Sequence, residues 1–221
     1  MNIFIAGASR GVGREIAQIL IDNQDQQPNN ITALVRSPNP ELEAMGINII
    51  IGDALNAIAV NQAMQAQPIE VVISMIGGLP KDGIRPDYLG NKNLIDAAVE
   101  AGVKKFILIT SLGTGNSAAA IPPPAYETLK PVLLEKEQAE NHLIQSGLNY
   151  TIIRPGGLKS APATGTAVLT TDYHVAGSIH RADVAALVCR CLNSPPSDRQ
   201  ILAAFDRTMI YGTPEFTEFI P

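Results

Sequence analysis

A glycine-rich turn near the start of the chain carries residue types that suit the binding of a dinucleotide. An apolar run at residues 3–6 leads into Gly7, Gly11 and Gly13, and an amphipathic segment follows. A diphosphate needs backbone N–H donors at close range and the positive end of a helix dipole. Glycine lets the backbone turn tightly and approach the ligand closely. We therefore expect a strand, a phosphate-binding turn and a helix N-terminus, in this order.

Contacts to the dinucleotide are expected along the whole turn. The spacing differs from G-x-G-x-x-G, so an ordinary glycine loop between a strand and a helix is the alternative. The strand–turn–helix order favours the cofactor interpretation. The candidate cofactor-binding residues of the turn are Gly7, Ser9, Arg10, Gly11, Val12 and Gly13.

The residue after the second expected strand bears on the choice between NAD(H) and NADP(H). An NAD-preferring fold places Asp or Glu there, to accept a hydrogen bond from the ribose 2′-hydroxyl. Here the place holds Arg36, which can instead pair with a 2′-phosphate. Arg10 could add a second positive charge. NADP(H) is therefore expected, unless Arg36 is simply a solvated arginine at a strand end.

The ends of the later strands supply the remaining candidate residues. Carboxyl ends of parallel strands meet at one edge of a sheet, so residues there would line one crevice. Asp53, followed by Ala54, could meet the adenine edge or could be a turn or N-cap aspartate. Pro155 and Gly156 could pass close to the nicotinamide or form a plain turn. The other candidates at strand ends are Gly77, Gly78, Thr110 and Ser111.

Composition narrows the classes of function. The 221 residues are 46% hydrophobic and carry a net charge of −5. No basic stripe suggests a nucleic-acid partner, and neither a membrane helix nor a signal peptide is indicated. Cys189 and Cys191 should face different sides of a helix and not pair. A cytoplasmic monomer or weak homodimer without a metal site is expected.

Expected strands and helices alternate along the chain. The strands are predicted at residues 3–6, 31–35, 47–51, 71–76, 106–109, 150–153 and 201–205. The helices are predicted at residues 10–22, 41–45, 55–66, 87–101, 131–145 and 181–192. Residues 23–30 and 112–125 are expected to be loops. The alternation predicts an α/β fold, a Rossmann-like doubly wound parallel sheet. Residues 1–221 would form a single domain, with a small substrate-side annex from about residue 157.

Short motifs occur along nearly the whole chain. They lie at residues 7–13, 34–36, 52–53, 93–98, 101–103, 146–156 and 181–185. Together they resemble the atypical short-chain dehydrogenases/reductases of the NmrA-like NAD(P)-binding branch. The last third is similar to biliverdin-IXβ reductase/flavin reductase. Its matching residues are Thr164, Gly165, Ser178, Ile179, Asp183, Arg190, Cys191 and Leu192. The resemblance implies NADPH-dependent hydride transfer to a flat conjugated acceptor: a flavin, bilin or quinone.

The resemblance also points to candidate catalytic residues. Family members use a serine after the fifth strand and Tyr-x-x-x-Lys on the next helix; Ser111 and Lys136 fit the serine and the lysine. Val132 stands where the tyrosine would be, and Tyr126 lies in the loop expected before the helix. Without that acid, a simple carbonyl loses its usual proton donor. A conjugated acceptor can spread the incoming charge and take its proton later from water.

Each candidate catalytic residue also has a structural alternative. Ser111 would orient the acceptor, or its hydroxyl could cap the strand end. Lys136 would hold the nicotinamide ribose, or pair with Glu140 on an exposed helix face. In bilin-reducing relatives a histidine follows the proline of strand six; Gly156 and Gly157 replace it, which opens the site.

Two other functions are compared with the reductase. A regulator, redox sensor or assembly factor of the NmrA-like type would bind NADP(H) without turnover, and the missing tyrosine supports this alternative. A sugar-nucleotide epimerase or dehydratase is disfavoured by the same absence and by the short C-terminal part. Ser111 helps to separate the reductase from the regulator, since a protein that only senses the cofactor needs no hydroxyl beside the hydride that is transferred.

Overall fold

The sheet at the centre of the chain is mostly parallel. The computed structural model describes residues 1–24, 28–78 and 83–221. In this part of the chain the eight-stranded sheet has the order β3-β2-β1-β4-β5-β6-β10-β8, and β8 runs antiparallel to β10. The strands are β1 (Asn2–Ala6), β2 (Asn30–Val35), β3 (Asn48–Ile51), β4 (Val71–Ser74), β5 (Lys105–Ile109), β6 (Tyr150–Pro155), β8 (Ala167–Thr170) and β10 (Gln200–Asp206). The predicted Rossmann-like fold is confirmed, with the antiparallel edge strand as an addition.

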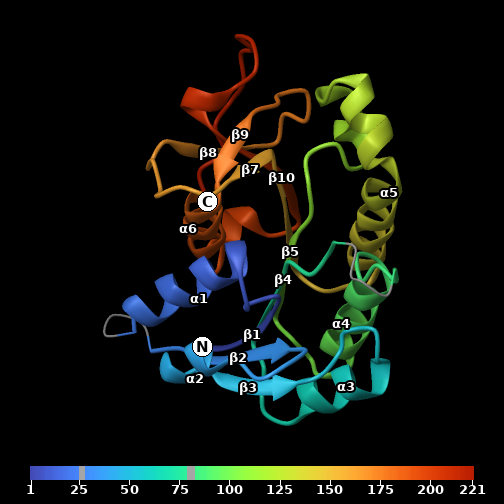
Figure 1. Cartoon of the computed structure of the whole chain (residues 1–221), viewed down its shortest axis with the longest axis vertical. Helices are drawn as coiled ribbons and strands as arrows, with labels where there is room; N and C mark the ends of the chain where they lie inside the picture. The colour runs from blue at the N-terminus through green and yellow to red at the C-terminus, as the bar shows by residue number, and fades with distance from the viewer. Residues whose placement is uncertain (25–27, 79–82) are drawn as a thin grey trace.

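Helices cover both faces of this sheet (Figure 1). One face carries α1 (Gly11–Asp22), α2 (Pro40–Ala44) and α6 (Arg181–Cys191). The other carries α3 (Ala57–Gln65), α4 (Leu89–Glu100) and α5 (Pro123–Gln145). Strand residues alternate between the two cores: Ile3 and Ile5 pack with the first group, and Phe4 with the second. Burial on both faces explains the continuous apolar runs in the strands.

The C-terminal part adds short elements that the sequence did not reveal. A second small sheet pairs β7 (Gly157–Lys159) with β9 (Ser178–His180) in parallel. This part also holds the short 3₁₀ helices η2 (Pro195–Ser197) and η3 (Arg207–Met209), while a further one, η1 (Gly115–Ala120), precedes α5. A separate apolar cluster joins Leu112 to Val168, Val175 and Phe205. Residues after 157 therefore complete the main sheet and also build over its carboxyl edge.

The start of α5 corrects one expectation. The helix begins at Pro123, eight residues before its predicted start at Pro131, and η1 occupies much of the loop predicted at 112–125. Proline fits the first turn of a helix, because the N–H that it lacks has no partner there. Tyr126 therefore lies in α5 and not in the preceding loop. Residues 25–27, within the loop expected at 23–30, lie outside the described residues.

Neither a membrane span nor a metal site emerges from the described ranges. None of their helices is long and apolar enough to cross a membrane, and they bring together no group of three His, Cys, Asp or Glu side chains suited to a metal. Cys189 and Cys191 are free, as predicted. Burial raises the pKa of Cys189 to about 12 and that of Cys191 to about 11, so both thiols stay protonated at neutral pH.

Candidate functional site

The glycine turn brings the end of β1 against the start of α1. Gly7 has a φ of +102°, a backbone angle that residues with a side chain rarely adopt. A Cβ on Gly13 would lie 2.1 Å from the carbonyl oxygen of Gly7, so no side chain fits between strand and helix. The N-cap residue of α1 is Arg10, whose side chain makes no capping hydrogen bond, and the first turn holds no acidic residue. Such a helix start suits an anion, because its first N–H groups lack a side-chain acceptor.

The candidate residues for the adenosine end lie at the ends of β2 and β3, which are neighbours in the sheet. Arg10 and Arg36 are exposed. Asp53 is exposed too, and its Oδ1 accepts a hydrogen bond of 2.9 Å from the backbone N–H of Leu55. This is the turn contact that the sequence left open as its alternative role. Ala54 is buried, and its carbonyl oxygen accepts a hydrogen bond of 2.8 Å from the Asn93 side chain.

A buried ion pair lies against the glycines that follow β4. Lys136 Nζ is 2.8 Å from Oδ1 of Asp87, whose side chain is fully buried. The other carboxylate oxygen of Asp87 accepts a hydrogen bond of 2.9 Å from the N–H of Gly78. A Cβ on Gly77 would lie 2.4 Å from Asp87 Oδ1 and 3.0 Å from Lys136 Nζ. The arrangement holds an ammonium group beside backbone that carries no side chain.

This ion pair settles one alternative for Lys136. A pairing with Glu140 on an exposed helix face is wrong, because Lys136 is only 15% exposed and pairs with Asp87. Sequence reasoning missed Asp87, placing it at the start of a helix. The two residues are far apart in the chain, and only the packing of α4 against α5 brings them together. No spacing rule could have found the pair.

The candidates at the end of β5 turn toward different partners. Ser111 is half-buried, and its hydroxyl donates a hydrogen bond of 3.0 Å to the carbonyl oxygen of Leu112. This local bond corresponds to the capping role named as its alternative. The Thr110 hydroxyl donates to Glu140 Oε1 over 2.6 Å, toward α5. Val132, at the tyrosine position, is half-buried on the same helix.

The end of β6 is anchored on both sides. The carbonyl oxygen of Pro155 accepts a hydrogen bond of 2.9 Å from Leu112, and the N–H of Gly156 donates to Ala204 over 2.9 Å. A Cβ on Gly156 would lie 2.1 Å from the carbonyl oxygen of Gly177, so the two backbones meet directly. These contacts fix the turn at the carboxyl edge of the sheet. Whether it meets a nicotinamide stays a prediction.

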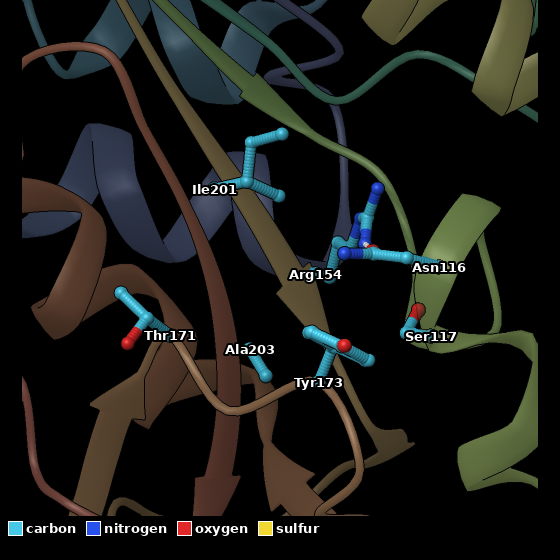
Figure 2. Close-up of a pocket in the computed structure, with 7 residues that line it drawn as sticks. All are labelled: Asn116, Ser117, Arg154, Thr171, Tyr173, Ile201 and Ala203. Atoms are coloured by element: carbon cyan, nitrogen blue, oxygen red, sulfur yellow. Dashed lines mark hydrogen bonds between the residues drawn. The ribbon is translucent and has the colours of Figure 1, made fainter.

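A buried network joins β6 to α5 below this turn. Arg154 donates from Nε and Nη2 to the two carboxylate oxygens of Glu140, over 3.0 and 2.6 Å, and both side chains are buried. Its Nη1 donates to Asn116 Oδ1, and Figure 2 shows these two side chains pointing toward one another. A cavity of about 30 Å³ adjoins them, lined by Asn116, Ser117, Arg154, Thr171, Tyr173, Ile201 and Ala203. This space suits a water molecule and not a dinucleotide.

The fold and the turn define a class of protein. A doubly wound parallel sheet, with an uncapped helix start behind a close-packed glycine turn, belongs to nucleotide-cofactor-binding proteins. The model of the NAD(P)H-binding family matches residues 7–195. The chain therefore belongs to the NAD(P)H-binding family. The close-packed glycine turn and the uncapped start of α1 fit the diphosphate of such a cofactor.

Three relatives narrow the comparison. An uncharacterized sugar epimerase of Bacillus subtilis, YhfK, is 33% identical over 214 residues, covering 94% of each chain. The structure of ChuY, an anaerobillin reductase from Escherichia coli O157:H7, superimposes with a TM-score of 0.84 at 32% identity, covering 94% of this chain and 98% of that one. Sanguinarine reductase of Eschscholzia californica is 31% identical over 172 residues, covering 69% of this chain and 62% of that protein. Two of these three NAD(P)H-binding relatives are described as reductases.

Proposed function

We propose that the chain is an NADPH-dependent reductase that transfers hydride to a flat conjugated acceptor, such as a flavin, bilin or quinone. The observation that carries the proposal is the Lys136 ammonium, held by buried Asp87 beside Gly77 at the carboxyl edge of the sheet. When bound, the cofactor supplies the hydride. Lys136 holds the hydroxyls of the nicotinamide ribose, and the turn of Pro155 and Gly156 borders the ring.

The diphosphate and the 2′-phosphate are assigned to separate groups. The glycine turn and the first N–H groups of α1 bind the diphosphate. Arg36, exposed at the end of β2, pairs with the 2′-phosphate, and Arg10 adds charge from the turn. Asp53 and Ala54 border the adenine. These assignments favour NADPH over NADH, since Arg36 offers donors and no acceptor for a free 2′-hydroxyl.

The choice of acceptor class depends on Val132. A simple ketone needs a proton at the forming alkoxide, and the residue four positions before Lys136 has no proton to give. A conjugated acceptor delocalises the incoming charge, so positioning matters more than acid catalysis. Ser111 orients this acceptor by exchanging its bond to Leu112 for one to the ligand. The relatives that are described as an anaerobillin reductase and a sanguinarine reductase support a conjugated acceptor.

Other properties complete the proposal. The part after residue 157 forms the acceptor side of a single domain, and the protein acts as a monomer or weak homodimer. The free, protonated cysteines support a reducing compartment such as the cytoplasm. Sugar-nucleotide epimerisation stays disfavoured, although one relative is named as an uncharacterized sugar epimerase.

A sensor that binds NADP(H) without turnover is the second candidate. Val132 favours it, and so does the local hydrogen bond of Ser111, which engages the hydroxyl with the backbone of Leu112. The two functions share the cofactor site and differ only in whether the bound cofactor is oxidised. A test must therefore measure NADPH binding and NADPH oxidation separately.

Oxidation of NADPH in the presence of an acceptor panel provides this test. The panel contains FMN, biliverdin, a quinone and a simple ketone, and calorimetry gives the NADPH Kd in parallel. The reductase predicts that at least one conjugated acceptor accelerates oxidation in proportion to protein, while the ketone does not. Tight binding of NADPH without acceleration by any acceptor would leave the sensor as the answer.

A variant pair on α5 tests the role of Lys136. Lys136→Met removes the ammonium and should weaken NADPH binding or turnover by about tenfold, as expected for a lost charge-assisted hydrogen bond. Lys130→Met removes an exposed lysine from the same helix and should leave both unchanged. Equal behaviour of the two variants would remove Lys136 from the site.

A further inference from the structure

The start of α6 places a second positive group against the glycine turn. Arg181 is the first residue of α6, which packs beside α1 on the same face of the sheet (Figure 1). A Cβ on Gly11 would lie 3.6 Å from both Cδ and Nε of Arg181. The arginine thus crosses the turn at the residue where α1 begins. The sequence placed Arg181 on a distant helix and gave it no part in the site.

We propose that Arg181 is a further cofactor-binding residue, which pairs with the diphosphate of NAD(P)H from the opposite side to the α1 N–H groups. The inference rests on the proposed cofactor site and adds a residue to it. A guanidinium fork suits phosphate oxygens and can hold two of them at once. The diphosphate then lies between two contributions, the start of α1 and the side chain of Arg181.

The charge of Arg181 is otherwise poorly placed. A cation in the first turn of a helix opposes the helix dipole, whose positive end lies there. Asp183, in the same turn, is buried and does not pair with Arg181: its oxygens accept from the N–H groups of Thr164 and Gly165. An anion in front of Gly11 would give this arginine the partner that its own helix does not supply.

One hydrogen bond already directs the side chain. Arg181 Nη1 donates to the hydroxyl of Ser160 over 2.7 Å, just after β7. This neutral contact engages one of five N–H donors, and within the described ranges no carboxylate forms an ion pair with the guanidinium. Ser160 therefore orients the guanidinium over the turn, and the remaining donors are available to phosphate oxygens.

The role differs from that of Arg36 in a measurable way. NADPH and NADH share the diphosphate, and only NADPH has the 2′-phosphate. Loss of a diphosphate contact should therefore weaken both cofactors by the same factor. Loss of a 2′-phosphate contact should weaken NADPH alone.

Calorimetric Kd values for NADPH and NADH test the proposal with the intact chain. Arg181→Gln should raise both Kd values by about tenfold or more, in equal proportion, and Arg181→Lys should recover part of the loss. Arg190→Gln removes a charge from the other end of α6, where the side chain is exposed, and should change neither Kd. Thermal unfolding of each variant shows whether it folds.

Three outcomes would overturn the assignment. If Arg181→Gln binds both cofactors like the wild type and only its melting temperature falls, Arg181 has a purely structural role through its hydrogen bond to Ser160. If NADPH alone is weakened, Arg181 binds the 2′-phosphate. If the wild type binds neither cofactor, the proposed cofactor site fails, and Arg181 with it; this result is distinct because it appears before any substitution.

Discussion

At the scale of single residues, the pair Lys136 and Asp87 combines a structural and a chemical role. A fully buried carboxylate is costly without a partner, and the ammonium at 2.8 Å provides one. The same contact fixes the ammonium beside Gly77, where a side chain would collide with it. The one ion pair therefore both positions the Lys136 ammonium and offsets the cost of burying the Asp87 carboxylate.

Removing the carboxylate should affect both properties. Asp87→Asn leaves the half-buried Lys136 ammonium without its counter-ion, so we expect a loss of about 3 kcal/mol in the free energy of unfolding. Urea unfolding of Asp87→Asn, Lys136→Met and the double variant measures the coupling. Strictly additive losses would mean that the two side chains do not interact in solution.

Arg36 carries the prediction on cofactor preference. Arg36→Ala should raise the Kd of NADPH by about tenfold or more and change that of NADH little, because only NADPH has the 2′-phosphate. Arg190→Ala, another exposed arginine, serves as the control. Equal losses for the two cofactors would place Arg36 away from the 2′-phosphate.

At the scale of elements, the contact between β1 and α1 sets the geometry of the turn. Gly13→Ala would place a Cβ 2.1 Å from the Gly7 carbonyl oxygen, so the helix start must shift. We expect a loss of about 1–3 kcal/mol in stability, as for other overpacked sites, together with weakened cofactor binding. Glu15→Ala, at an exposed position of the same helix, is the control. Wild-type stability and binding in Gly13→Ala would contradict the close packing.

The loop after β7 is tied to the end of β10 by Asp206. Burial alone would raise the pKa of Asp206, but hydrogen bonds from Thr164, Thr208 and Thr166 outweigh it and lower the pKa to about 2. A depressed pKa contributes stability that is fully present above the unfolded value, near pH 4, and is lost as the pH falls toward 2. The contribution at neutral pH is about 2 kcal/mol.

The pH dependence of unfolding checks this prediction. Stability of the wild type should fall between about pH 4 and pH 2 more steeply than that of Asp206→Asn, which has no carboxylate to protonate. Urea midpoints at several pH values give the two slopes. Parallel slopes would show that Asp206 does not titrate as its hydrogen bonds require.

The elements differ in how well the sequence predicted them. The long apolar strands and the glycine turn were evident, because burial on both faces and a required backbone conformation leave a direct pattern. Strands β7 and β9 span only three residues each and leave almost none, and the four-residue β8 was missed as well. The start of α5 was missed because prolines that fit a first turn also suit a loop.

The site shows the same division. Candidates defined by their place after a strand lie at the carboxyl edge, as expected of parallel strands. Asp87 was missed because its ion-pair partner Lys136 lies on a helix far away in the sequence, and the position of Arg181 beside Gly11 was missed for the same reason. Local patterns can locate a turn, and long-range packing decides which charges face it.

At the scale of the whole molecule, the cofactor should act as a ligand of the folded state. The proposed diphosphate site would join α1 and, through Arg181, α6, so binding should stabilise both helices against unfolding. NADPH at about 100 times its Kd should add about 2.7 kcal/mol, seen as a higher melting temperature. NADP⁺ should act likewise, whereas an unchanged melting temperature would contradict a cofactor site in the native fold.

Hydride transfer itself is the central claim, and a deuterium isotope effect tests it most directly. NADPH and NADPH deuterated at the nicotinamide C4 position are compared with the best conjugated acceptor of the panel, under single-turnover conditions. We predict that the deuterated cofactor is oxidised more slowly. The slowing should appear only when the deuterium lies on one particular face of the nicotinamide ring, because the protein should present a single face to the acceptor. Tight NADPH binding without any acceptor-dependent oxidation would contradict the claim and identify a sensor instead.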